Sequence, residues 1–114
     1  MTKTKLELTW IGKDKRPRLE PRILLEDPKL SYHSKSKVSE NDIFDNKLIK
    51  GDNLLALKAL EREYAGKVKC IFIDSPYNTQ SAFEHYDDKL EHAQWLSMMY
   101  PRLVLLHTLL AHDG

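Results

Sequence analysis

The sequence is poor in features that mark several large classes of protein: it contains one cysteine, four glycines and no long apolar run. A single cysteine excludes an internal disulfide, and the place of Cys70 in the apolar run 68–73 predicts that it packs in a core. No apolar run is long enough for a membrane span, and the charged residues 1–15 lack the pattern of a signal peptide. These absences predict a cytoplasmic protein without membrane contact.

The same scarcity argues against two kinds of site. The glycines stand at positions 12, 51, 66 and 114, too far apart for the glycine-rich loop that cradles ATP phosphates. The five histidines and the cysteine do not have the spacing of zinc ligands. We therefore expect neither ATP hydrolysis nor a metal site.

Positive charge is concentrated near the amino terminus, although the net charge is only +1. Residues 1–37 hold ten Lys or Arg against five Asp or Glu, and an excess of this kind suits a segment that follows a phosphate backbone. Prolines prevent a long helix there, so a solvated, partly extended arm also explains these residues and is the simpler interpretation. The candidate DNA-binding group comprises Lys13, Lys15, Arg16, Arg18 and Arg22.

The sequence pattern changes after this arm. Residues 1–46 are expected to form a basic arm and linker, and residues 47–114 to form the amino-terminal part of an α/β domain. Within the domain, residues 47–50 and 68–73 have the apolar content of short strands, and residues 54–64 place apolar side chains on one helical face. Together they predict a right-handed βαβ unit with parallel strands.

Turn and capping residues stand at the ends of the predicted helix 54–64. Asp52 or Asn53 is available as the amino-terminal cap, and Gly66 suits the carboxyl-terminal end. In a parallel unit, Gly51 and Asp52 lie at the same sheet edge as the residues that follow the second strand. This placement makes Asp52 a candidate cofactor-binding residue in a pocket that both segments share.

The carboxyl-terminal third is expected to form a long helix, about residues 91–111, which Pro101 bends or divides. Apolar residues recur there at intervals of three and four, as in a stripe that packs against a sheet. A stripe containing methionine and tryptophan also suits a partner surface. Its members are Trp95, Met99, Leu103, Leu106 and Leu110.

The most informative segment is Asp74-Ser75-Pro76-Tyr77, which directly follows the apolar run 68–73. It places a carboxylate, a stiff turn and an aromatic ring at the carboxyl end of an expected strand, where open α/β sheets bind their ligands. A turn that merely ends the strand is the alternative, because Asp, Ser and Pro favour turns.

With Asn78 and Thr79, this segment resembles the Asp-Pro-Pro-Tyr-Asn-Thr motif of DNA amino-methyltransferases, which methylate the exocyclic amine of adenine or cytosine with S-adenosylmethionine. Such enzymes flip the target base out of the duplex. The resemblance implies that the Asp74 carboxylate and the Ser75 carbonyl accept hydrogen bonds from the target amine. Tyr77 would stack on the base, and Pro76 would hold the turn open.

Two residues depart from the motif: Ser75 replaces a proline, and Gln80 stands where glycine is common. Ser75 still supplies a backbone carbonyl, but the turn loses one fixed φ angle and is less preorganised. Enzymes that methylate cytosine N4 usually begin the motif with Ser, whereas this chain begins it with Asp74. Adenine N6 is therefore the expected target.

Four further segments extend the resemblance to nearly the whole chain. They look like the opening of the modification subunit of type III restriction-modification systems. The resemblance implies a Rossmann-like methyltransferase fold, adenine-N6 methylation of double-stranded DNA, a homodimer, and association with a restriction helicase-nuclease subunit. The segments are residues 10–13, 22–25, 49–54 and 95–99.

The glycine turn Phe-x-Gly-x-Gly, with which these enzymes bind S-adenosylmethionine, does not occur in the sequence. In the subgroup that the chain resembles, this turn follows the target-base motif, so we expect the chain to be an amino-terminal fragment that is inactive alone. A non-catalytic module for DNA binding or subunit assembly is the alternative function.

Overall fold

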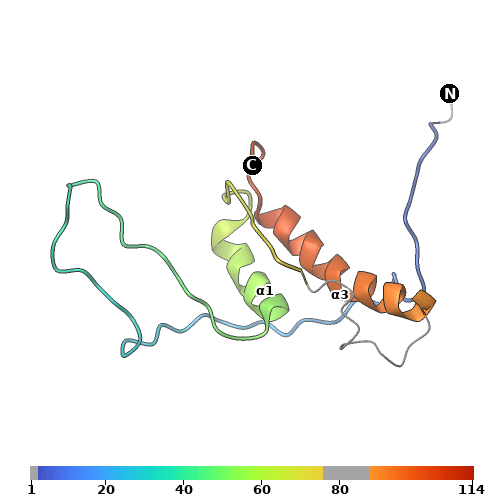
Figure 1. The fold of residues 1–114 in the computed structure, drawn as a ribbon, viewed down its shortest axis with the longest axis horizontal. Coiled ribbons are helices and arrows are strands. Elements are labelled where there is room, and N and C mark those ends of the chain that lie inside the picture. Colours follow the sequence, from blue (N-terminus) through green and yellow to red (C-terminus); the bar gives the residue numbers. More distant parts are fainter. Residues whose placement is uncertain (1–2, 76–87) are drawn as a thin grey trace.

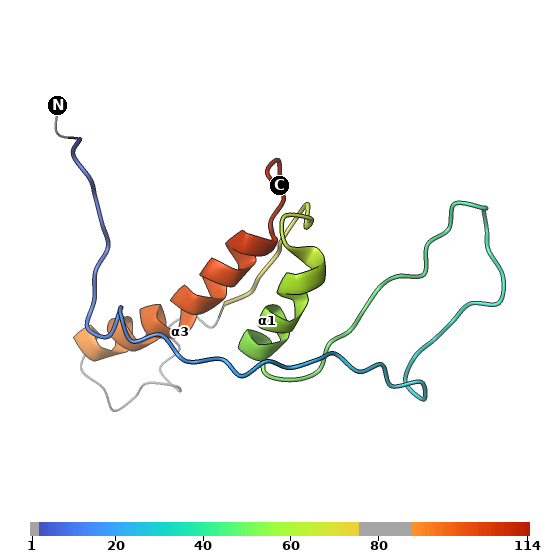
Figure 2. The same ribbon diagram turned by 180° about the vertical axis from the view of Figure 1, so that it is seen from behind.

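The computed structural model describes residues 3–75 and 88–114. Two α-helices, α1 (Asn53–Tyr64) and α3 (Asp88–Leu109), pack side by side and form the centre of the molecule (Figure 1). Residues 3–50 contain turns but neither helix nor strand, and their second half makes a wide excursion away from the helices (Figures 1 and 2). No helix in the described part of the chain has the length and apolar character needed to cross a membrane.

The prediction for α1 is confirmed, with Asp52 as its amino-terminal cap. The Asp52 carboxylate accepts hydrogen bonds from the backbone N–H groups of Leu54 and Leu55, at 2.9 and 3.1 Å. These N–H groups have no partner within the helix, so the cap satisfies donors that would otherwise face water. At the other end, Gly66 has a φ of 69°, a left-handed conformation that glycine adopts without strain.

Removal of the cap gives a first prediction. Asp52→Ala should lower the free energy of unfolding of the chain by about 1 kcal/mol, because two backbone donors lose their acceptor. Urea denaturation followed by far-UV circular dichroism measures this loss. Asp52→Asn is the matched control, since asparagine caps equally well; an equal loss in both variants would show that the cap does not stabilise α1.

The prediction of a long carboxyl-terminal helix is also confirmed, and α3 runs through Pro101. Proline has no N–H to donate to the carbonyl four residues earlier, and α3 changes direction near its middle (Figures 1 and 2). Next to this bend, the Arg102 side chain donates to the Met98 carbonyl (2.6 Å) and to Asn53 Oδ1 (2.7 Å). Arg102 therefore joins the middle of α3 to the start of α1.

The predicted apolar stripe on α3 is wrong after Pro101, where Leu106 and Leu110 are only half-buried. Met99 is buried as expected, but Leu103 is 45% exposed, and the buried side chains that follow Pro101 are Leu105 and Leu109. Residues 103–106 are all apolar, so the sequence pattern does not decide which face of this half of α3 is buried. In the structure, the face that carries Leu105 and Leu109 is buried. In the described residues the core is small: Leu54, Ala93, Met99, Leu105 and Leu109.

The expected βαβ unit is not confirmed. In the described residues, the stretches 47–50 and 68–73 do not form strands, and a single parallel bridge joins Val68 to Leu110. At this bridge Val68 N donates to the Leu109 carbonyl (2.9 Å), and Ala111 N donates to the Val68 carbonyl (2.7 Å). A strand needs a neighbour along its length to satisfy its backbone groups. The bridge pairs a residue before α3 with a residue after it, whereas the expected strands would have paired across α1.

Because the described residues form no sheet, the prediction for Cys70 is also wrong. Its side chain is exposed, not packed in a core, and neighbouring Phe72 is 92% exposed. Apolar side chains of a central strand are buried by the layers that cover the sheet. Without these layers the run 68–73 contributes little to the core. The buried side chains of the core come from α1 and α3.

Candidate active site

Asp74 and Ser75 lie at the end of a segment that follows α1 and runs back beside both helices toward the end of α1 at which Asp52 lies (Figures 1 and 2). Asp74 is exposed and Ser75 is half-buried. The Asp74 carboxylate forms no hydrogen bond or ion pair with the described residues. Its oxygens are therefore open to accept hydrogen bonds from a ligand. Pro76 and Tyr77, the other two predicted site residues, lie outside the described residues.

Asp52, which is predicted to bind the cofactor, caps α1 in the structure. One oxygen of its carboxylate, Oδ1, accepts both capping hydrogen bonds. The residue also lines a cavity of about 180 Å³ together with Arg22, Lys50 and apolar side chains of α1. Asp74 does not line this cavity. The described structure thus does not join Asp52 and Asp74 in one pocket.

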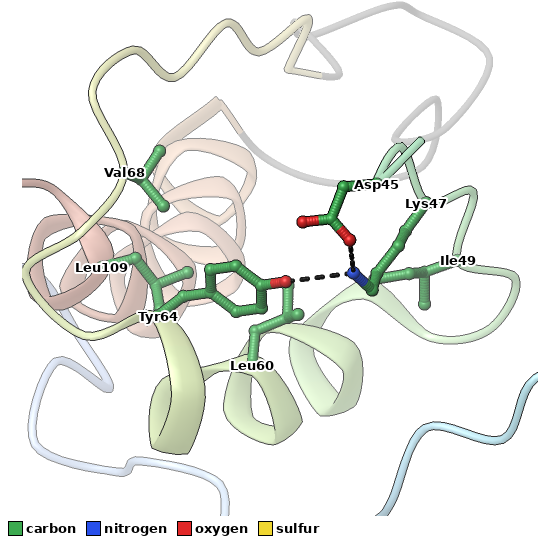
Figure 3. A pocket seen from close by; sticks show the side chains of 7 residues that line it. All are labelled: Asp45, Lys47, Ile49, Leu60, Tyr64, Val68 and Leu109. Atoms are coloured by element: carbon green, nitrogen blue, oxygen red, sulfur yellow. Dashed lines mark hydrogen bonds and ion pairs between the residues drawn. The ribbon is translucent and has the colours of Figure 1, made fainter. Parts of the chain in front are cut away.

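A second cavity, of about 240 Å³, lies between α1, α3 and the chain that leads to α1 (Figure 3). The Lys47 ammonium donates to the Tyr64 hydroxyl (3.2 Å) and to Asp45 Oδ1 (3.3 Å). These two partners, Tyr64 first, raise the pKa of Lys47. The Lys47 ammonium thereby ties residues 45–47 to α1. Nothing in the sequence pattern indicated this contact.

The five candidate DNA-binding residues of the arm fall into two groups. Lys13 is only 17% exposed and donates to Glu7 Oε1 (2.9 Å) and to the Leu8 carbonyl (2.6 Å). The hydrogen bond from Lys13 lowers the pKa of Glu7. Arg16 donates to the Tyr100 hydroxyl, and Arg22 forms an ion pair with Glu20. Three of the five residues thus have polar partners within the protein. Lys15 and Arg18 are exposed and have no ion pair with the described residues.

Sequence reasoning missed the contact between the arm and α3. Trp10 Nε1 donates to Ser97 Oγ at 2.9 Å, and the Trp10 ring meets the Tyr100 ring edge-on, with centroids 5.3 Å apart. The available signal was a lone tryptophan within a charged segment, where a solvated arm gives no reason for one. This part of the arm is docked, whereas most of residues 20–48 is exposed.

Comparison with known proteins gives consistent results. Residues 68–114 match a family model described as DNA methylase. The chain is 50% identical over 70 residues to the probable type III restriction-modification enzyme HindVI Mod subunit of Haemophilus influenzae; the match covers 61% of this chain and 9% of that protein. It is 33% identical to the EcoPI Mod subunit of Escherichia phage P1, over 100% of this chain and 22% of the relative. The type II methyltransferase M.EcaI of Enterobacter cloacae is 42% identical over 78 residues, covering 63% of this chain and 17% of that enzyme.

The chain spans only 9 to 22% of the length of these three relatives. The alignment with the EcoPI Mod subunit extends over 147 positions, so that relative contains residues without a counterpart among the 114 of this chain. No solved structure matches the chain.

Proposed function

We propose that the chain, which matches a DNA methylase family model over residues 68–114 and is similar to the Mod subunits of type III restriction-modification enzymes, supplies the target-base motif of a site-specific DNA methyltransferase. The methyl group passes from S-adenosylmethionine to adenine N6. The observation that carries the proposal is the family match over residues 68–114, which includes Asp74-Ser75-Pro76-Tyr77. The unengaged Asp74 carboxylate supports it.

In the proposed reaction, the Asp74 carboxylate and the Ser75 carbonyl accept hydrogen bonds from the amino group of a flipped adenine. These bonds would turn the lone pair of the nitrogen toward the methyl group that S-adenosylmethionine supplies. The N–C bond would form as the S–C bond breaks with its electron pair going to sulfur, S-adenosylhomocysteine would leave, and the nitrogen would release one proton to water. Tyr77 stacks on the base, and Pro76 keeps the turn open. Asp52 is assigned to the cofactor side of the site because its second oxygen, Oδ2, is not used by the cap.

We extend the proposal to the architecture and location of the complete enzyme. Residues 47–50 and 68–73 become strands of a Rossmann-like sheet, and residues 1–46 form a separate arm and linker. The enzyme is a cytoplasmic homodimer that associates with a restriction helicase-nuclease subunit. The kinship with type III Mod subunits supports these assignments.

A chimera tests the function directly. Residues 1–114 replace the aligned segment of the EcoPI Mod subunit, and nucleosides from treated DNA are separated and identified by mass spectrometry. The appearance of N6-methyladenine supports the proposal, and N4-methylcytosine would reassign the target base. A folded, DNA-binding chimera without either product would favour the second candidate function, a non-catalytic module for DNA binding or subunit assembly.

DNA contact by the arm is proposed for Lys15 and Arg18 in particular, because the other three basic residues have partners within the protein. In the chimera, Lys15→Gln with Arg18→Gln should lower the slope of log K against log salt by up to about 2, one unit for each lost phosphate contact. Lys13→Gln is the control and should leave the slope unchanged. Equal slopes in all the proteins would remove the arm from the DNA interface.

A further inference from the structure

Arg102 is the first residue after Pro101, and its half-buried side chain joins the two helices. Arg102 Nε donates to Oδ1 of Asn53, the first residue of α1, at 2.7 Å. A terminal nitrogen of the same guanidinium donates to the Met98 carbonyl at 2.6 Å. The planar guanidinium carries several donors in a fixed geometry, so one side chain holds both acceptors at once. Arg102 thereby fixes the start of α1 against the middle of α3.

Asp52 is held against the first turn of α1 by the backbone of that turn. Its Oδ1 accepts the two capping hydrogen bonds, and its carbonyl accepts a third from Ala56 N at 2.9 Å. These bonds set the position of the Asp52 carboxylate relative to α1, including that of Oδ2, which the cap does not use. Because Asn53 directly follows Asp52, the hydrogen bond from Arg102 lies one residue away from this carboxylate. A shift of the start of α1 therefore moves Asp52 with it.

The other end of the same half of α3 holds the segment that leads to Asp74. Val68 N donates to the Leu109 carbonyl (2.9 Å), and Ala111 N donates to the Val68 carbonyl (2.7 Å). The helix is continuous from Arg102 to Leu109. One helical stretch thus carries the start of α1, with Asp52, at its beginning and the approach to the target-base segment at its end.

We propose that Arg102 is a positioning residue for the binding of S-adenosylmethionine: through Asn53 it fixes the Asp52 carboxylate relative to α3. This inference rests on the proposed function, in which Asp52 lies on the cofactor side of the site. Arg102 itself touches neither the cofactor nor the target base. Loss of its bond to Asn53 weakens cofactor binding, because Oδ2 of Asp52 is then free to leave the position that binding requires.

The test measures the dissociation constant of S-adenosylmethionine for the chimera without DNA, by isothermal titration calorimetry. Arg102→Gln removes the charged donors, and Asn53→Ala removes only the acceptor on α1, so it leaves the bond to the bend of α3 in place. Each should raise the dissociation constant about five-fold, the scale of one net hydrogen bond. Arg62→Gln is the matched control, because it removes the same charge from an exposed position of α1, and it should change nothing.

A double-mutant cycle separates positioning from general support of the fold. Asp52→Asn keeps the helix cap but replaces the free carboxylate oxygen with an amide NH₂, so it removes the group that Arg102 is proposed to position. In the Asp52→Asn background, Arg102→Gln should therefore cause no further loss of cofactor affinity. An equal loss in both backgrounds would overturn the proposal. So would an unchanged dissociation constant in Asn53→Ala and Arg102→Gln, or in Asp52→Asn alone.

Failure of this inference and failure of the proposed function give different results. If the unsubstituted chimera forms N6-methyladenine and binds S-adenosylmethionine equally well with Arg102 or with glutamine at that position, the positioning role fails alone. If a folded chimera methylates no DNA, the proposed function fails, and the positioning role fails with it. Activity of the unsubstituted chimera together with the non-additive loss of cofactor affinity supports both.

Discussion

Asp74→Ala in the active chimera is expected to reduce kcat for adenine methylation by about 100-fold or more, the scale seen when one preorganised polar group is removed from a reaction centre. An exocyclic amine is a weak nucleophile because its lone pair is delocalised into the ring. Without the carboxylate, only the Ser75 carbonyl remains to reorient the amine. DNA affinity should change little, because phosphate contacts dominate it. Single-turnover methylation and equilibrium DNA binding measure the two effects separately.

Two further variants sharpen this test. Asp74→Asn keeps the shape and one acceptor oxygen, so its loss should be smaller than that of alanine. Asp14→Ala removes an exposed carboxylate from the arm and should have no effect on turnover. Near-normal turnover in Asp74→Ala would show that the segment 74–77 is a strand-ending turn and not a target-base site.

The elements that could be predicted from the sequence are those that local interactions determine. Residues 54–64 were expected to be helical, and α1 is Asn53–Tyr64 with the expected cap at Asp52. A cap, a periodic apolar face and a glycine at the end all act within a few residues of each other, so they are visible in sequence. The apolar pattern also predicted α3, although the apolar run 103–106 left the face that it buries ambiguous.

The strands could not be predicted reliably because they depend on partners remote in sequence. The apolar content of residues 68–73 suits a central strand, but in the described structure only Val68 is paired, with Leu110. The docking of Trp10 on Ser97 was missed for the same reason, since composition describes the arm as charged and says nothing of a contact 87 residues away. For the candidate site, sequence identified Asp74 and Ser75 as neighbours at the end of one segment. It did not show that Asp52 lines a cavity without Asp74.

The second large effect concerns the chain of 114 residues by itself, which we expect to bind S-adenosylmethionine no more than nonspecifically and to transfer no detectable methyl group. Its sequence contains no Phe-x-Gly-x-Gly turn. Without a site that holds donor and acceptor together, the large rate advantage of proximity is lost. Isothermal titration calorimetry with S-adenosylmethionine and incorporation of labelled methyl groups into DNA measure both expectations. Saturable binding of one cofactor per chain, or incorporation that Asp74→Ala eliminates, would contradict them and show that residues 1–114 hold a complete active site.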